Sequence, residues 1–164
     1  MRVDETPYEN ENRGVVIVDA RKFLTLWRAH RPGLQREIAR GNPDTWRQDY
    51  RYPAAAEGFS HGFKNPVPLA QVGYTEWGHT AVSYKFLWLG RQEQTEHFRY
   101  VTFTNGIART IWLLSHGCSA FPVECRLSSA RELHRAAALK GTRLFTVRDV
   151  QEGLIPVNHP PPYH

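Results

Sequence analysis

The 164-residue sequence is poor in cysteine and contains no long apolar run. Its two cysteines, Cys118 and Cys125, are separated by six residues, a spacing that fits no zinc site, and the eight histidines form no paired-ligand motif. We therefore expect two buried free thiols, with a disulfide as the less favoured alternative. No apolar stretch approaches membrane-spanning length, and the N-terminus lacks the charged-then-apolar order of a signal peptide. These absences predict a cytoplasmic protein.

The composition is that of a folded domain with a basic surface. Hydrophobic residues make up 41% and aromatic residues 12%, which excludes a disordered chain. The net charge of +5 favours a polyanionic partner. We predict a flexible segment over residues 1–13, one domain over 14–157 and a mobile proline-rich tail over 158–164.

The first sixty residues carry scaffold patterns and no chemical signature. The β-branched run Val15–Val18 predicts a buried strand, and apolar residues at helical spacing predict helices over 21–30 and 32–41. Asp44 is the expected cap of a short helix through Trp46, whose length Pro53 limits.

Two further patterns predict a hairpin and a late helix. Residues 82–89 and 98–104 read as antiparallel strands joined by the polar segment 90–97. A capping-box pattern, Ser129 to Glu132, predicts the start of a helix that Gly141 ends, followed by a short strand over 143–147. The basic residues near that helix predict either a solvated face or contact with a nucleic-acid backbone.

The stretch from Val101 to Cys125 reads as strand, turn, helix, turn and strand. Asn105 and Gly106 form a turn dipeptide, and apolar residues at helical spacing follow until Gly117, a typical C-cap. Such a turn directs the backbone N–H groups of Ile107, Ala108 and Arg109 and the positive end of the helix dipole at one point. The Arg109 guanidinium and the Thr110 hydroxyl could add to this anion site. An ordinary strand-to-helix connection with a surface arginine is the open alternative.

A second glycine-containing segment, residues 58–65, resembles a phosphate loop only superficially. Its spacing does not fit G-x-x-x-x-G-K-[ST], and Pro66 and Pro68 stand where the helix should begin, so a Walker ATPase is rejected. Lys64 and His61 could still meet phosphate beside the first turn. A plain surface loop is the alternative.

The turn also carries a resemblance. The run Asn-Gly-Ile-Ala-Arg-Thr at 105–110, with Phe-Pro-Val-Glu at 121–124, resembles the Asp-Gly-x-His-Arg … Pro-Val-x-Val run of the ParB/sulfiredoxin superfamily, and within it plasmid fertility-inhibition factors of the Osa and FiwA kind. Asn105 replaces the motif aspartate and Ala108 the motif histidine. Ile107 stands where sulfiredoxins carry their reactive cysteine. The chain also ends too soon after the motif for the helix-turn-helix domain of a ParB-type partition protein.

The resemblance implies an α+β fold: a single ParB/sulfiredoxin-like domain with a small mixed sheet and flanking helices. It implies an ATPase and DNase that binds ATP, with Mg²⁺ as the candidate metal, and blocks conjugative or type IV secretion by destroying the transferred strand. The implied partners are transferred or relaxase-bound DNA and a type IV secretion coupling protein. The implied location is the cytoplasm, with contact to the inner membrane only through such a partner.

Each site residue has an expected role. Phosphate would sit on the N–H groups that follow Gly106, with Thr110 and Lys64 nearby; Arg109 would offset charge developing on phosphorus and Asn105 would orient an oxygen. Glu124 is the candidate for activating water or holding a metal; a solvent-facing strand residue is the alternative.

Two other functions stay open. The loss of the motif histidine at Ala108 favours a non-catalytic binder of nucleic acid or of a secretion component. A regulatory nuclease acting elsewhere in plasmid biology is the other.

Overall fold

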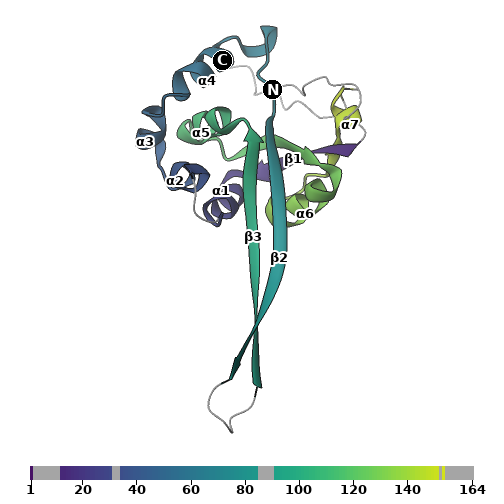
Figure 1. The fold of residues 1–164 in the computed structure, drawn as a ribbon. Helices are drawn as coiled ribbons and strands as arrows, with labels where there is room; N and C mark the ends of the chain where they lie inside the picture. The colour runs from purple at the N-terminus through teal and green to yellow at the C-terminus, as the bar shows by residue number, and fades with distance from the viewer. Residues whose placement is uncertain (2–11, 31–33, 85–90, 152, 154–164) are drawn as a thin grey trace.

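The computed structural model describes residues 1, 12–30, 34–84, 91–151 and 153. Five strands form one mixed sheet in the order β3-β2-β4-β1-β5 (Figure 1). Neighbouring strands are antiparallel except β2 and β4, which pair in parallel. The strands are β1 (Arg13–Asp19), β2 (Ala70–Tyr84), β3 (Arg91–Asn105), β4 (Ala120–Arg126) and β5 (Phe145–Thr146). The predicted α+β class with a small mixed sheet and flanking helices is confirmed.

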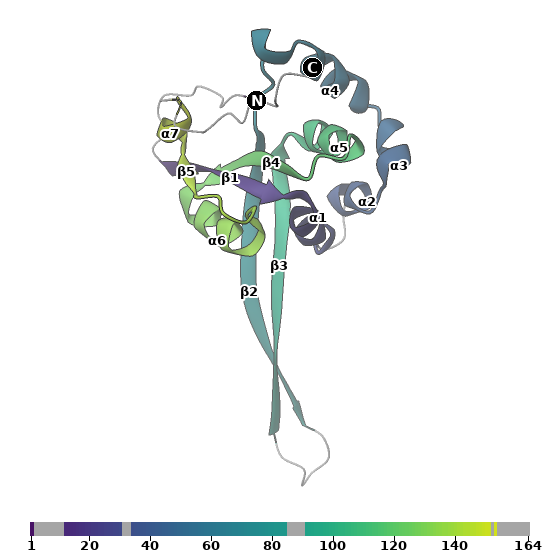
Figure 2. The ribbon, with the colours of Figure 1, turned by 180° about the vertical axis from the view of Figure 1, so that it is seen from behind.

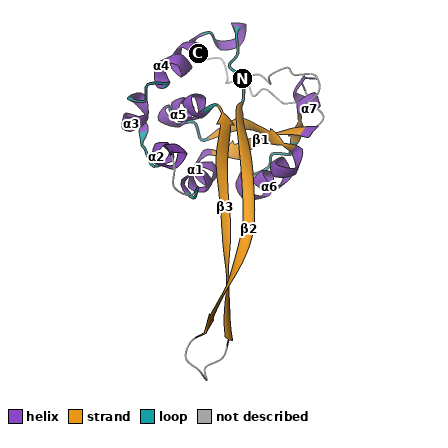
Figure 3. Ribbon diagram, in the orientation of Figure 1, coloured by secondary structure: helices purple, strands orange, loops and turns teal. Residues whose placement is uncertain are grey.

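Helices surround this sheet, as Figure 3 shows. They are α1 (Ala20–Arg28), α2 (Leu34–Ala39), α3 (Pro43–Arg47), α4 (Tyr52–Ser60), the 3-10 helix η2 (Gly62–Lys64), α5 (Ile107–Ser115), α6 (Leu127–Ala137) and α7 (Val147–Gln151). The first helix follows β1 directly, because the Asp19 carboxylate accepts hydrogen bonds from the N–H groups of Arg21 and Lys22, both at 3.0 Å. In the ranges the structure describes, no helix is both long and apolar enough to cross a bilayer.

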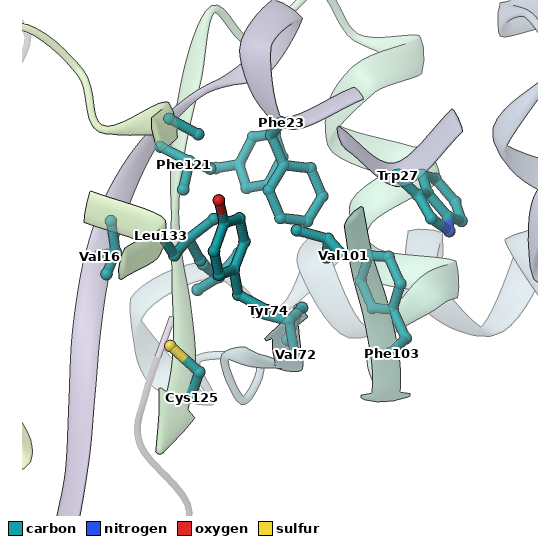
Figure 4. Packing of buried hydrophobic residues seen from close by; sticks show 14 of the residues in the cluster. Val16, Phe23, Trp27, Val72, Tyr74, Val101, Phe103, Phe121, Cys125 and Leu133 are labelled. Atoms are coloured by element: carbon teal, nitrogen blue, oxygen red, sulfur yellow. The ribbon is translucent and has the colours of Figure 1, made fainter. Parts of the chain in front are cut away.

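One face of the sheet carries the main core, which is rich in aromatic rings (Figure 4). Phe23 from α1 makes edge-to-face contacts with Phe103 of β3 and Phe121 of β4, with ring centroids 5.8 and 5.4 Å apart. Trp27 packs on Phe103 at 4.8 Å. Each of these rings is at least nine-tenths buried, so their burial joins α1 to two strands of the sheet, β3 and β4.

The opposite face of the sheet has a smaller apolar cluster. Its members are Val15, Leu69, Phe145 and Val147, all buried. Because side chains alternate along a strand, β1 gives Val15 to this cluster and Val16 to the main core.

Most of the β2–β3 hairpin projects beyond the body of the protein (Figures 1 and 2). The two strands pair with each other from Gln71 and Asn105 to Tyr84 and Arg91. Only Ala70 and Gln71 of β2 pair with β4. The hairpin is therefore part of the sheet at one end and a two-stranded ribbon at the other.

A side-chain amide covers the edge of β3 next to the body. The Gln35 carboxamide of α2 donates from Nε2 to the carbonyl of Phe103 and accepts from the Phe103 N–H, both at 3.0 Å. Gln35 thus satisfies both outward-facing backbone groups of this residue, as a neighbouring strand would.

The hairpin prediction was wrong in its register. Residues 91–97, predicted as a connection, belong to β3, and β2 begins at Ala70 and reaches only Tyr84; residues 85–90 lie outside the described part. A ribbon that leaves the body has no core-facing side to require alternating apolar residues, so the polar run over 91–97 looked like a turn.

Three helix starts also differ from prediction. Asn42, not Asp44, caps α3, accepting from the N–H groups of Asp44 and Thr45. Pro53 lies in the first turn of α4 instead of ending a helix, because proline is tolerated there. The chain passes from β4 directly into α6 at Leu127, so the predicted capping box lies inside that helix, which ends at Ala137 instead of Gly141.

The predicted boundaries of the domain are tested only in part. Arg13, assigned to the flexible segment, is the first residue of β1. The rest of that segment over 2–11, and the tail over 158–164, lie outside the described residues.

Candidate phosphate-binding site

The turn between β3 and α5 has the geometry that the sequence predicts. Gly106 adopts φ 96° and ψ 12°, a left-handed conformation that favours glycine. It also packs tightly: a Cβ at this position would lie 2.6 Å from Ala70 Cα and 3.0 Å from Arg109 Nη2. Conformation and close packing each require glycine here, and together they fix the turn against the first residue of β2.

The nine-residue helix α5 begins directly after this turn. The Thr110 N–H donates to the Gly106 carbonyl at 3.0 Å, the first bond of the helical pattern. The preceding N–H groups, those of Ile107, Ala108 and Arg109, have no acceptor within the helix. The side chains of these three residues are half-buried, so the N-terminal turn lies near the surface. This is the arrangement that binds anions at helix N-termini.

The Arg109 side chain remains beside the turn. Its Nη2 donates to the backbone carbonyl of Leu69 at 3.3 Å, and the side chain is half-buried. The guanidinium therefore lies within reach of an anion at the N-terminus of α5. It already donates a hydrogen bond to Leu69, the residue before β2.

Thr110 faces the interior instead of the surface. Its side chain is completely buried, and its hydroxyl has no hydrogen-bond partner among the described residues. The sequence predicts that this hydroxyl lies beside the bound anion. In the structure it is enclosed in the interior instead.

The register of the sheet brings three polar residues into one row. Asn105 pairs with Gln71 across β3 and β2, and Gln71 pairs with Glu124 across β2 and β4. Directly paired residues point to the same face, so these side chains share a face, with Asn105 and Glu124 two strand spacings, about 10 Å, apart. We call Asn105, Gln71 and Glu124 the polar row.

A β-bulge makes this row possible. The β2–β3 register shifts by one residue between Gln71 and Val72, which places Asn105 instead of Thr104 opposite Gln71. Because a one-residue slip turns a side chain to the other face, Asn105 would otherwise face away from Glu124.

The far end of the polar row is an ion pair. Glu124 is 1% exposed, and its Oε1 lies 2.7 Å from Nε of Arg13, whose side chain is 15% exposed. The alternative interpretation of Glu124 as a solvent-facing strand residue is therefore wrong. By contrast, Asn105 is exposed and Gln71 is half-buried. The row thus runs from solvent at Asn105 to a buried charge pair at Glu124.

Lys64 lies apart from these groups. It is the exposed last residue of η2, and in the described part of the chain no hydrogen bond or ion pair joins it to the turn. His61, also exposed, follows α4 directly. These residues belong to the segment before β2 and not to the polar row.

Two groups of the site were not singled out from the sequence. Gln71 enters through strand pairing, and Arg13 through its ion pair with Glu124. One signal for Glu124 was available, since a carboxylate between Val123 and Cys125 in a buried strand needs a cationic partner. Nothing in the sequence showed that Arg13 is this partner.

The thiols have different surroundings. Both cysteines are free; Cys118 is half-buried and Cys125 is buried. Burial, with a smaller contribution from the charge of Glu124, raises the pKa of Cys125 to about 12. Burial also raises the pKa of Cys118. The expectation of free thiols is confirmed for both residues, whereas the expected burial is found for Cys125 only.

Comparison with known proteins identifies the family. The family model of plasmid fertility inhibition factors matches residues 15–138, a range that holds the turn and the polar row but not Arg13. Protein osa of Shigella flexneri is 33% identical over 113 residues, which are 68% of this chain and 49% of that protein. The chain thus spans about half the length of this curated relative.

A solved structure agrees with this assignment. The crystal structure of oncogenic suppression activity protein, a plasmid fertility inhibition factor, studied as a gold(I) cyanide derivative, is similar with a TM-score of 0.67 and 26% identity. The similarity covers 94% of this chain and 74% of that one. On the matched sequence range and the shared fold, the chain belongs to the plasmid fertility inhibition factor family.

Proposed function

We propose that the protein inhibits DNA transfer in conjugation or type IV secretion by hydrolysing phosphoesters: it hydrolyses ATP and, under control of ATP, cuts the transferred strand. The observation that carries this proposal is the convergence of Asn105, Arg109 and Glu124 on one end of the sheet around the Gly106 turn. These residues come from two strands and a helix and are separated by up to nineteen positions in the sequence, and the sheet register places Asn105 and Glu124 about 10 Å apart.

Phosphate binding is the first step. The N–H groups of the first turn of α5 and the positive end of its dipole favour an anion, with Arg109 beside them. A guanidinium can bind phosphate oxygens through two parallel charge-assisted hydrogen bonds, which are stronger than a hydrogen bond to a neutral carbonyl such as the one from Arg109 to Leu69. A bound phosphate would therefore draw Arg109 away from that carbonyl.

Hydrolysis requires charge stabilisation and an activated water. Arg109 would offset the charge that develops on the phosphoryl oxygens. Asn105, exposed at the open end of the polar row, would orient an oxygen through its carboxamide. Glu124 would activate water only after it separates from Arg13, because the ion pair occupies one of its oxygens.

The residues do not build a metal site of their own. In the described ranges, no three His, Cys, Asp or Glu side chains lie close enough together to hold a metal ion, and Glu124 is engaged with a cation. We therefore assign no catalytic step to Mg²⁺.

The proposal extends to partners. The net charge of +5 is suited to a transferred single strand or to relaxase-bound DNA. We place this action in the cytoplasm, before the strand leaves the cell, with a secretion coupling protein as the contact to the membrane.

A second candidate is a non-catalytic binder of nucleic acid or of a secretion component. Two contacts favour it: the hydrogen bond from Arg109 to Leu69 and the ion pair between Glu124 and Arg13. In each of these contacts, a side chain that catalysis would need is already bound to another part of the protein.

Purified protein can be assayed for turnover of ATP and of single-stranded DNA, and for binding of both. Arg109→Ala should abolish turnover and weaken nucleotide binding, whereas Arg131→Ala, which removes an exposed arginine of α6, should change neither. Equal turnover by wild type and Arg109→Ala would contradict the catalytic proposal. Binding without turnover in the wild type would favour the binder.

A further inference from the structure

The projecting part of the hairpin, which we call the arm, comprises residues 75–84 of β2 and 91–100 of β3 (Figures 1 and 2). At its base, Trp77 and Phe98 are paired across the strands and stack with ring centroids 4.8 Å apart. Trp77 remains 40% exposed there. On the other face of the ribbon, Glu76 and Arg99 form an exposed ion pair at 2.9 Å.

The charge of the arm differs from that of the whole chain. It contains two arginines and three glutamates, whereas the chain carries a net charge of +5. Affinity for a nucleic-acid backbone depends on an excess of basic residues. An aromatic surface with no such excess is instead suited to contact with protein.

The outer edge of β3 is covered by a side chain near the body, and the same edge continues along the arm. Near the body, Gln35 bonds to both outward-facing backbone groups of Phe103. The β2–β3 register is uniform from Phe103 to Arg91, so every second residue along this strand turns its N–H and carbonyl away from β2 in the same way. The residues so placed beyond Phe103 are Val101, Arg99, His97, Thr95 and Glu93.

The arm also lacks several of the usual protections of an exposed edge. The sequence has no proline between Pro68 and Pro122, and no lysine within the two arm segments. Proline, lysine and bulges are common means of preventing strand addition, and within the described pairs of the hairpin the register shift lies at Gln71, inside the body; the charged residues of the arm are of both signs. A two-stranded ribbon is only marginally stable alone, so the arm gains from a further strand.

We propose that the arm is a dimerisation element, in which the β3 edges of two copies pair antiparallel to form a four-stranded sheet. Antiparallel pairing of one strand with itself satisfies two-fold symmetry, so a second copy supplies a matching edge by construction. Four outward-facing arm residues from each copy, Arg99, His97, Thr95 and Glu93, offer about eight hydrogen bonds, which is within the range typical of a specific interface. The added strands also extend the face that carries Trp77 and Phe98. This inference is independent of the proposed hydrolase.

The test is the mass of the full chain by sedimentation over a range of concentrations. We expect a dimer that dissociates on dilution. His97→Pro removes one outward-facing N–H without removing a β2–β3 hydrogen bond, so it should give a monomer at concentrations where wild type is dimeric. His97→Ala keeps that N–H and should remain dimeric.

Because the proline variant could become monomeric through local unfolding alone, a second measurement uses the wild-type protein. In wild type, hydrogen exchange at the amides of His97 and Arg99 should be slow in the dimer and fast after dilution. A monomeric mass at every concentration would overturn the proposal. So would a His97→Pro protein that is fully dimeric together with wild-type amides at His97 and Arg99 that exchange fast in the dimer. So would a monomer that binds a single-stranded oligonucleotide through the arm and loses this binding on Trp77→Ala.

Discussion

The two faces of the sheet use the same strands for different purposes. On one face, Phe23, Trp27, Phe103 and Phe121 interlock in the main core. On the other face, the smaller cluster is bordered by the polar row and the Arg13–Glu124 pair. Because side chains alternate along a strand, β4 gives Val123 to the main core and Glu124 to the polar row.

This comparison explains where the structure tolerates polar groups. A core of close-packed rings has no room for an unpaired charge. The second face holds a carboxylate that is 1% exposed only because a guanidinium lies 2.7 Å away. The polar row therefore lies on the face that contributes less apolar burial.

The largest expected effect comes from breaking the buried ion pair. Glu124→Ala should lower the free energy of unfolding by about 3 kcal/mol, because it leaves the Arg13 guanidinium largely buried without this carboxylate. Chemical denaturation of purified protein measures the change.

The matched control replaces both partners. In the double variant Arg13→Met/Glu124→Leu, the stability should recover to within about 1 kcal/mol of wild type, because apolar side chains of similar size do not incur the desolvation cost of the charges. If Glu124→Ala alone is as stable as wild type, the pair does not stabilise the second face.

A smaller effect is expected at the first turn of α5. Thr110→Val keeps the shape of the side chain and removes a buried hydroxyl that has no hydrogen-bond partner among the described residues. Thermal and chemical unfolding should show a gain of about 1 kcal/mol in the free energy of unfolding. Nucleotide binding should be unchanged, since the hydroxyl is enclosed. A loss of binding with unchanged stability would instead place Thr110 in the site.

The smallest effect distinguishes the two cysteines. The pKa of Cys125 is raised to about 12, so near pH 8 almost all of it is the unreactive thiol and it is also buried. Cys118 is half-buried and should react first with a thiol reagent in folded protein. Mass spectrometry after limited labelling should find the label on Cys118 alone until denaturant is added; early labelling of Cys125 would show that the main core opens.

Local patterns predicted the centre of the fold well. The strand, turn, helix and strand over Val101–Cys125 follow from short-range periodicity and from the turn glycines, and Gly106 has the expected left-handed conformation. Identification of Arg109 and the α5 amides as neighbours rested on this local geometry, as the helix places them in its first turn.

Pairing over long distances could not be predicted. The polar row depends on the parallel β2–β4 contact and on the register shift after Gln71. No local sequence pattern indicates either of them. The hairpin was misplaced for the same reason, since its strands continue past the body where no apolar alternation is required. Whether the converging residues perform catalysis stays a prediction.

The tight approach of Gly106 to Ala70 has one more consequence. With glycine at the turn and Ile107 and Ala108 behind it, an anion seated at the N-terminus of α5 would be held by peptide N–H groups and by Arg109, which contact only its oxygens. Such a contact does not depend on the group to which the phosphate is attached. A nucleoside triphosphate and a polynucleotide would then compete for the same few atoms, each excluding the other.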